Sequence, residues 1–88
     1  MTPSQARVWA RYKATELRDK ADYLHGLVPN VVCLDLCNAS RSLFDLALGW
    51  AITPDAKKRL LPLLSEEDTA RLKRCFKGKF NKNKEVQN

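Results

Sequence analysis

The chain has 88 residues, 44% of them hydrophobic and 30% charged, and a formal net charge of +6 at pH 7. That length allows one domain with a small core, and this composition excludes a fully disordered chain. So small a core leaves little room for a deep substrate cavity. No apolar run approaches the ~18 residues of a membrane-spanning helix, and the N-terminus lacks the hydrophobic core of a signal peptide. We therefore expect a cytoplasmic, non-enzymatic protein that makes no membrane contact.

The positive charge is concentrated in the last third of the chain. Residues 1–52 hold six Lys and Arg against five Asp and Glu, whereas residues 53–88 hold ten against five. A positive field of this kind favours anionic partners, although it says nothing about the fold.

The first predicted element is a long helix that begins after Thr2. Thr2 can cap the helix, Pro3 suits its first position, and Gln5 completes a capping box. The helix should run to about His25, because Gly26 offers a C-terminal stop. One side of it carries a narrow stripe with helical spacing: Ala10, Ala14, Leu17, Ala21 and Leu24.

A second apolar grouping, Val8, Trp9, Tyr12 and Tyr23, projects to the far side of the same helix. An arginine ridge separates the two sides, formed by Arg7, Arg11 and Arg18. Trp and Tyr supply many of the residues that dominate protein interfaces, and arginines often rim them. We therefore predict a partner-binding site at Trp9, Tyr12, Tyr23, Arg7, Arg11 and Arg18. The alternative is that the fourth predicted helix or the tail folds over the aromatic side chains.

Residues 31–52 form the most apolar segment, and we predict a buried central helix there. Its polar residues define one narrow seam with helical spacing: Asp35, Asn38, Ser42, Asp45 and Gly49. A helix that is apolar over most of its circumference is normally buried, and the seam would be its solvent-facing edge. A strand at VVCLDL is the rival interpretation, but the chain offers no second strand to pair with it.

Two short helices are expected next. The third helix begins at Thr53 and Pro54, which repeat the start signal of the first. Its basic residues, Lys57, Lys58 and Arg59, should face outward, and Pro62 should end or kink it. Ser65 then caps a fourth helix, and Gly78 ends it. Leu72 and Phe76 are its predicted core positions. The fold class is therefore all-α: a compact bundle of about four helices, two long and two short, around the central helix 31–52. Residues 1–78 form the domain, and residues 79–88 form a mobile basic tail.

The chain carries no catalytic, cofactor or metal signature. Its three cysteines cannot all pair within one chain, and Cys33, Cys37, Cys75 and His25 lack the usual spacing of zinc ligands. Asp35 and Asp45 lie ten residues apart, or ~15 Å along a helix, which is too far for a paired acid and base. No glycine-rich phosphate loop is present.

The sequence therefore favours a small protein-binding regulator or inhibitor that occupies a surface on a larger protein. The alternative is a nucleic-acid-binding accessory protein that contacts phosphates through basic residues of the C-terminal third. Those residues are Lys57, Lys58, Arg59, Arg71, Arg74, Lys79, Lys82 and Lys84. Homodimerisation through the aromatic face of the first helix is a third alternative.

Overall fold

The computed structural model describes residues 1–80, which fold into α-helices and one short 3-10 helix with no β-strand among them. The elements, in chain order, are α1 (Pro3–Leu24), α2 (Asn30–Ala47), α3 (Pro54–Leu60), η1 (Leu61–Leu63), α4 (Glu66–Cys75) and α5 (Lys77–Phe80). The predicted all-α fold is confirmed. No helix within residues 1–80 is long and apolar enough to cross a membrane.

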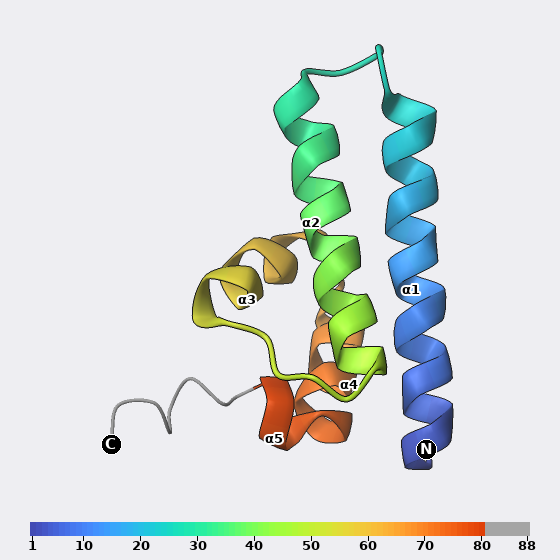
Figure 1. Cartoon of the computed structure of the whole chain (residues 1–88), viewed down its shortest axis with the longest axis vertical. Helices are drawn as coiled ribbons and strands as arrows, with labels where there is room; N and C mark the ends of the chain where they lie inside the picture. The colour runs from blue at the N-terminus through green and yellow to red at the C-terminus, as the bar shows by residue number, and fades with distance from the viewer. Residues whose placement is uncertain (81–88) are drawn as a thin grey trace.

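The two long helices form an antiparallel hairpin that is only half covered. Figure 1 shows α1 and α2 side by side, with their loop at one end and α3, α4 and α5 gathered around the other half. Large apolar side chains near the loop are consequently exposed: Tyr23 is 77% exposed, Leu27 70% and Val31 60%. The hairpin tip therefore has no cover from the rest of the described chain.

The first helix matches its prediction closely. The Thr2 hydroxyl accepts from the Gln5 amide at 3.1 Å, and the Gln5 side chain accepts from the Thr2 amide at 2.9 Å, which completes the capping box. Gly26 follows the helix with a φ of +83°, a conformation that favours glycine. The alanine and leucine stripe is buried against α2 as expected, except that Leu24 is half-buried, and Ala6 extends the stripe toward the N-terminus.

Small side chains allow α1 and α2 to approach closely. Ala10 and Ala14 are completely buried, and the Ser40 hydroxyl donates to the Ala14 carbonyl at 2.6 Å. A second contact of this kind joins the Cys33 thiol to the Ala21 carbonyl at 3.5 Å. A side chain in van der Waals contact with the backbone of the neighbouring helix leaves little space for added volume.

The second helix is shorter than predicted. We expected residues 31–52, but α2 ends at Ala47. Gly49 has a φ of +90°, and the Trp50 amide donates to the Asp45 carbonyl at 2.9 Å, so the chain leaves the helix in a tight turn. Gly49 is therefore the end signal of the helix and no part of a polar seam. Beyond it, a short connection carries the buried Ile52 back toward α3.

The burial of α2 also differs from its prediction. We expected apolar cover on most sides, but Leu34 is 59% exposed and Leu48 is 63% exposed. The polar seam was expected to face solvent, yet Ser42 is buried and Asn38 and Asp45 are half-buried beside α3. The helices after α2 are too short to surround it, so α3 covers its polar side and an apolar side is left open.

The C-terminal helices begin where their capping residues predict. The Thr53 hydroxyl accepts from the Ala56 amide and the Ser65 hydroxyl accepts from the Asp68 amide, both at 3.1 Å. Pro62 lies within η1, where α3 has ended, as expected. Leu72 and Phe76 are buried, which confirms both predicted core positions.

The predicted end of the domain lies too early in the sequence. α4 stops at Cys75, and Gly78 lies inside the additional short helix α5 instead of closing the fold. The Phe80 side chain, predicted to belong to the tail, is only 1% exposed and belongs to the core. The domain thus extends at least to Phe80. The remaining residues of the predicted tail, 81–88, lie outside the described part of the chain.

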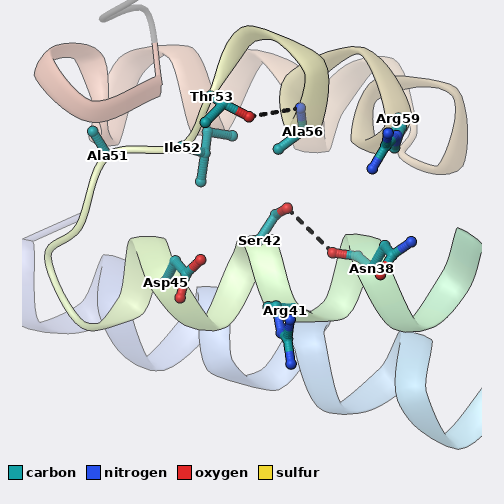
Figure 2. A pocket seen from close by; sticks show the side chains of 9 residues that line it. All are labelled: Asn38, Arg41, Ser42, Asp45, Ala51, Ile52, Thr53, Ala56 and Arg59. Carbon is teal, nitrogen blue, oxygen red and sulfur yellow. Dashed lines mark hydrogen bonds between the residues drawn. The ribbon is translucent and has the colours of Figure 1, made fainter.

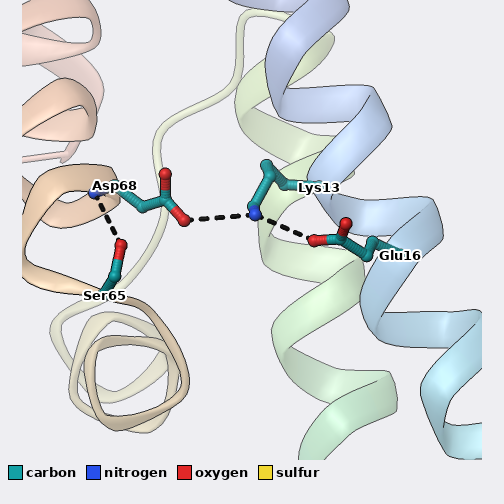
Figure 3. Close-up of polar contacts among 4 residues, drawn as sticks. All are labelled: Lys13, Glu16, Ser65 and Asp68. Atoms are coloured by element: carbon teal, nitrogen blue, oxygen red, sulfur yellow. Dashed lines mark hydrogen bonds and ion pairs between the residues drawn. The ribbon is translucent and has the colours of Figure 1, made fainter.

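Lys13 connects α1 to α4. Its ammonium group lies 2.8 Å from a Glu16 carboxylate oxygen and 3.1 Å from a carboxylate oxygen of Asp68, near the start of α4 (Figure 3). The Lys13 and Asp68 side chains are only 20% and 16% exposed. Hydrogen bonding to Glu16, followed by the contacts with Asp68, raises the pKa of Lys13 above its ordinary value of 10.5. This bridge holds the first turn of α4 against α1.

Replacing Lys13 with methionine should lower the free energy of unfolding at neutral pH by about 1 kcal/mol, because Asp68 loses its partner. Since folding raises the pKa of Lys13, its contribution is fully present below pH 10.5 and is lost as the pH rises through the raised value. The difference between wild type and variant should therefore shrink above that pH. Urea unfolding at a series of pH values measures it, and a pH-independent difference would contradict the electrostatic origin.

Candidate partner-binding surfaces

An apolar hollow lies on the outer side of α1, near its N-terminus. Val8 and Tyr12 are 66% and 63% exposed, and Trp9 is half-buried between them and α4. The guanidinium of Arg71 on α4 lies 5.1 Å from the centre of the Trp9 ring, so α4 covers one part of the indole. With Ser4 and Gln5, these side chains line a hollow of about 450 Å³. We call Val8, Trp9 and Tyr12 the outer patch.

Tyr23 does not belong to the outer patch. It stands eleven residues beyond Tyr12, which places it on the same side of α1 but roughly 16 Å further along the axis. There it is exposed at the hairpin tip, near Leu27 and Val31. The sequence pattern grouped Tyr23 with Trp9 and Tyr12, and the structure separates it from them.

The predicted arginine ridge borders a different feature, the groove between α1 and α2. Arg18 lines a hollow of about 390 Å³ together with Cys37, Arg41 and Phe44 of α2. At the other end of the groove, the guanidinium of Arg7 lies beside Gly49, 3.8 Å from the position a Cβ would take there. Arg11 shares their stripe, because it follows Arg7 by four residues and precedes Arg18 by seven.

Most of this groove lies on the side of α1 that faces away from the α4 contact at Trp9. Arg18 follows Trp9 by nine residues, which at 100° per residue points it away from the side on which Trp9 meets Arg71 of α4. We call this feature the hairpin groove. On α1, Arg18 lines it, and helical spacing extends its stripe through Arg11 to Arg7. On α2, Cys37, Arg41 and Phe44 line it. Steps of three and four residues extend this α2 wall to exposed Leu34 and Leu48.

The six described basic residues of the nucleic-acid alternative come from three helices, and two of them lie against aromatic rings. The Lys57 ammonium lies 4.9 Å from the centre of the Phe80 ring, Arg71 lies over Trp9, and Arg59 lines a pocket between α2 and α3. Three others are exposed on three different helices: Lys58, Arg74 and Lys79. Lys82 and Lys84 lie outside the described residues. Phe80 is buried, so its ring is not available to stack on a nucleic-acid base.

A polar pocket of about 250 Å³ separates α2 from α3 (Figure 2). Its two hydroxyl groups are engaged with the backbone, since Ser42 donates to the Asn38 carbonyl at 3.2 Å and Thr53 caps α3. Figure 2 shows that Arg41, although it borders this pocket, is directed toward α1. The pocket contains no histidine or cysteine that could act with these hydroxyls as a nucleophile and base.

The remaining groups that could take part in chemistry are one histidine and three cysteines. His25, the only histidine in the chain, is exposed in the loop of the hairpin. Cys33, Cys37 and Cys75 are free thiols. Within residues 1–80, no three His, Cys, Asp or Glu side chains lie close enough together to hold a metal ion. The described surface therefore offers the outer patch and the hairpin groove as its best-defined candidate sites.

Sequence reasoning found the aromatic residues and the arginine ridge but missed the α2 wall of the hairpin groove. The signal was present, because Leu34, Cys37, Arg41, Phe44 and Leu48 follow helical spacing as clearly as the polar seam does. This spacing was not taken as a sign of an exposed surface, because a helix that is apolar on several sides is normally buried on all of them. Which apolar side is open depends on where the later helices pack.

The chain matches no protein-family model, no curated protein and no solved structure. The function proposed next therefore rests on the geometry and chemistry of the described residues.

Proposed function

We propose that this protein is a small, non-enzymatic regulator or inhibitor that binds a larger protein through the α1–α2 hairpin and occupies a surface on it. The observation that carries the proposal is the outer patch. Val8 and Tyr12 remain more than 60% exposed beside Trp9, although the opposite side of the same helix is fully packed. A tryptophan and a tyrosine in one apolar hollow are typical of the centre of a protein interface.

The outer patch is also held rigidly. The capping box fixes the first turn of α1, buried alanines fix its inner side against α2, and Arg71 restrains the Trp9 ring. A surface that is already ordered loses little conformational entropy when it binds. This favours a protein that acts by occupying a site on its partner without rearranging.

Nucleic-acid binding is the alternative, and the described residues favour it less. A phosphate backbone is recognised by basic side chains that follow one track, whereas Lys57 and Arg71 are engaged with rings of their own chain. Homodimerisation through the outer patch is the other alternative, which light scattering or sedimentation would reveal as a dimeric mass.

The proposal predicts that a double variant, Val8→Ser with Tyr12→Ala, loses its protein partner. Affinity capture from lysate of the native host, after nuclease treatment, should recover a partner with wild type and at least tenfold less of it with the variant. Both positions are exposed, so the circular dichroism and melting temperature of the variant should match wild type within a few degrees.

A matched control replaces Lys73 and Arg74, two exposed residues of α4, with alanine, and should capture as much partner as wild type. Equal capture by the folded Val8/Tyr12 variant and wild type would contradict a role for the outer patch. Capture that disappears with nuclease would favour the nucleic-acid alternative instead.

A further inference from the structure

The hairpin groove has the shape and chemistry of a docking site for a helix. Leu34 and Leu48 are 59% and 63% exposed, and half-buried Phe44 lies between them on the same side of α2. From Leu34 to Leu48 the α2 wall spans fourteen residues, or roughly 21 Å along the axis. Its steps of three and four residues are the spacing at which one helix packs its ridges against another.

Four arginines surround this apolar stripe, and none of them is neutralised by the described part of the chain. Arg18 and Arg41 line the same hollow from the two helices, and Arg11 and Arg7 continue the stripe of Arg18 along α1 by helical spacing. The ion pairs within residues 1–80 both belong to Lys13, on the side of α1 that meets α4. The hairpin groove is therefore apolar along its length and positively charged along its edge.

We infer that the hairpin groove binds an acidic amphipathic helix of a partner protein. Large aliphatic side chains of that helix would pack on Leu34, Phe44 and Leu48. Its Asp and Glu residues would form ion pairs with Arg11, Arg18 and Arg41. Such a helix would complete a three-helix arrangement on the uncovered side of α1 and α2. This inference rests on the proposed function, because it assigns the chemistry of the partner.

The apolar stripe distinguishes this occupant from the other candidates. Nucleic acid would satisfy the arginines, but its phosphates would leave Leu34 and Leu48 without apolar contacts. The hairpin groove of a second copy would bring eight arginines together, and like charges across an interface are strongly unfavourable. An acidic amphipathic helix complements both the apolar and the charged part of the groove.

A designed peptide tests the inference directly. The probe is a fluorescent helix of about 21 residues, three heptads long, with leucine at positions a and d and glutamate at e and g, used at concentrations where it is monomeric. Fluorescence anisotropy should show saturable binding to the full chain. The Arg11→Glu/Arg18→Glu variant and, separately, the Leu34→Ser/Leu48→Ser variant should each weaken it tenfold or more.

The matched control, Lys58→Glu/Lys73→Glu, makes the same charge change at exposed positions of α3 and α4 and should bind within twofold of wild type. A second peptide with lysine at e and g should prefer the Arg11→Glu/Arg18→Glu variant over wild type. Circular dichroism establishes that each variant is folded. Three results would overturn the inference. The peptide does not bind, or the groove variants and the control weaken its binding equally. The third is that duplex DNA of equal charge displaces the bound probe as effectively as unlabelled acidic peptide does.

The two proposals can fail separately. The Val8→Ser/Tyr12→Ala variant should bind the acidic peptide as wild type does, because the outer patch and the hairpin groove lie on different sides of α1. Loss of peptide binding with intact partner capture would overturn the groove assignment alone. Intact peptide binding with no captured protein would contradict the proposed function and leave the groove chemistry standing.

Discussion

Replacing Phe80 with alanine is expected to lower the free energy of unfolding by about 3 to 5 kcal/mol. The Phe80 ring is among the largest fully buried side chains, with 1% exposure, and the Lys57 ammonium lies 4.9 Å from its centre. The backbone next to it is also anchored, because the Ile52 amide donates to the Lys79 carbonyl at 3.4 Å. Removing the ring would leave a cavity under α3 and α5, and Phe76 is the only other phenylalanine in the core of residues 1–80.

Lys79→Ala is the matched control, since Lys79 is the exposed neighbour on the same short helix. It should change the stability by less than about 0.5 kcal/mol. Urea unfolding followed by circular dichroism measures both variants. A Phe80→Ala variant as stable as Lys79→Ala would show that the domain ends before α5, as the sequence suggests.

The second large effect is expected at Ala14. An Ala14→Leu substitution should lower the free energy of unfolding by about 3 kcal/mol, at the upper end of the range for overpacking. Ala14 is completely buried, and its carbonyl accepts from the Ser40 hydroxyl at only 2.6 Å. The larger leucine side chain would force α1 and α2 apart and break this hydrogen bond.

Thr15 provides an internal control, because it is the next residue on the same helix and is exposed. Thr15→Leu should leave stability within about 0.5 kcal/mol of wild type or raise it slightly, since leucine is a better helix former than threonine. Thermal and urea unfolding of the two variants give the comparison. Similar stabilities for Ala14→Leu and Thr15→Leu would contradict the close approach of the two long helices.

Local signals were the part of this fold that sequence could predict. Helix starts depend on a capping hydroxyl and the amide three residues later, so Thr2, Thr53 and Ser65 could each be recognised from a few neighbouring residues. The buried stripe of α1 was equally accessible, because a row of alanines at helical spacing favours close packing against another helix. Each of these features is decided within a few helical turns.

Features that depend on distant parts of the chain were not predictable in this way. The burial of Ser42 is decided by α3 packing against that side of α2, and the exposure of Leu34 is decided by the limited length of the later helices. Gly78 has the residue type that often ends a helix, so the sequence predicted that the domain stops there. No neighbouring residue shows that Phe80, at the end of α5, reaches the core. Apolar patterning identifies which sides of a helix can be buried, and only the packing decides which of them are.

The same distinction applies to the candidate sites. Sequence located Trp9, Tyr12 and the arginine ridge, since their residue types and spacing are local properties of α1. Helical spacing alone turns Arg18 away from Trp9, but the surroundings of each depend on the packing, which puts Arg71 over Trp9 and Phe44 beside Arg18. Tyr23 was grouped with the others by its side of the helix, although its spacing already places it roughly 16 Å from Tyr12 along the axis.

The central claim is that a protein partner binds the α1–α2 hairpin, and site-specific photocrosslinking in the native host tests this claim most directly. A photoreactive phenylalanine analogue would replace Tyr12 of the outer patch, Phe44 of the hairpin groove or, as a control, exposed Arg74 on α4. We expect position 12 and position 44 to form an adduct with the same protein, unchanged by nuclease, while position 74 forms none. Adducts equally abundant from all three positions, or adducts that nuclease removes, would contradict a protein partner bound on this hairpin.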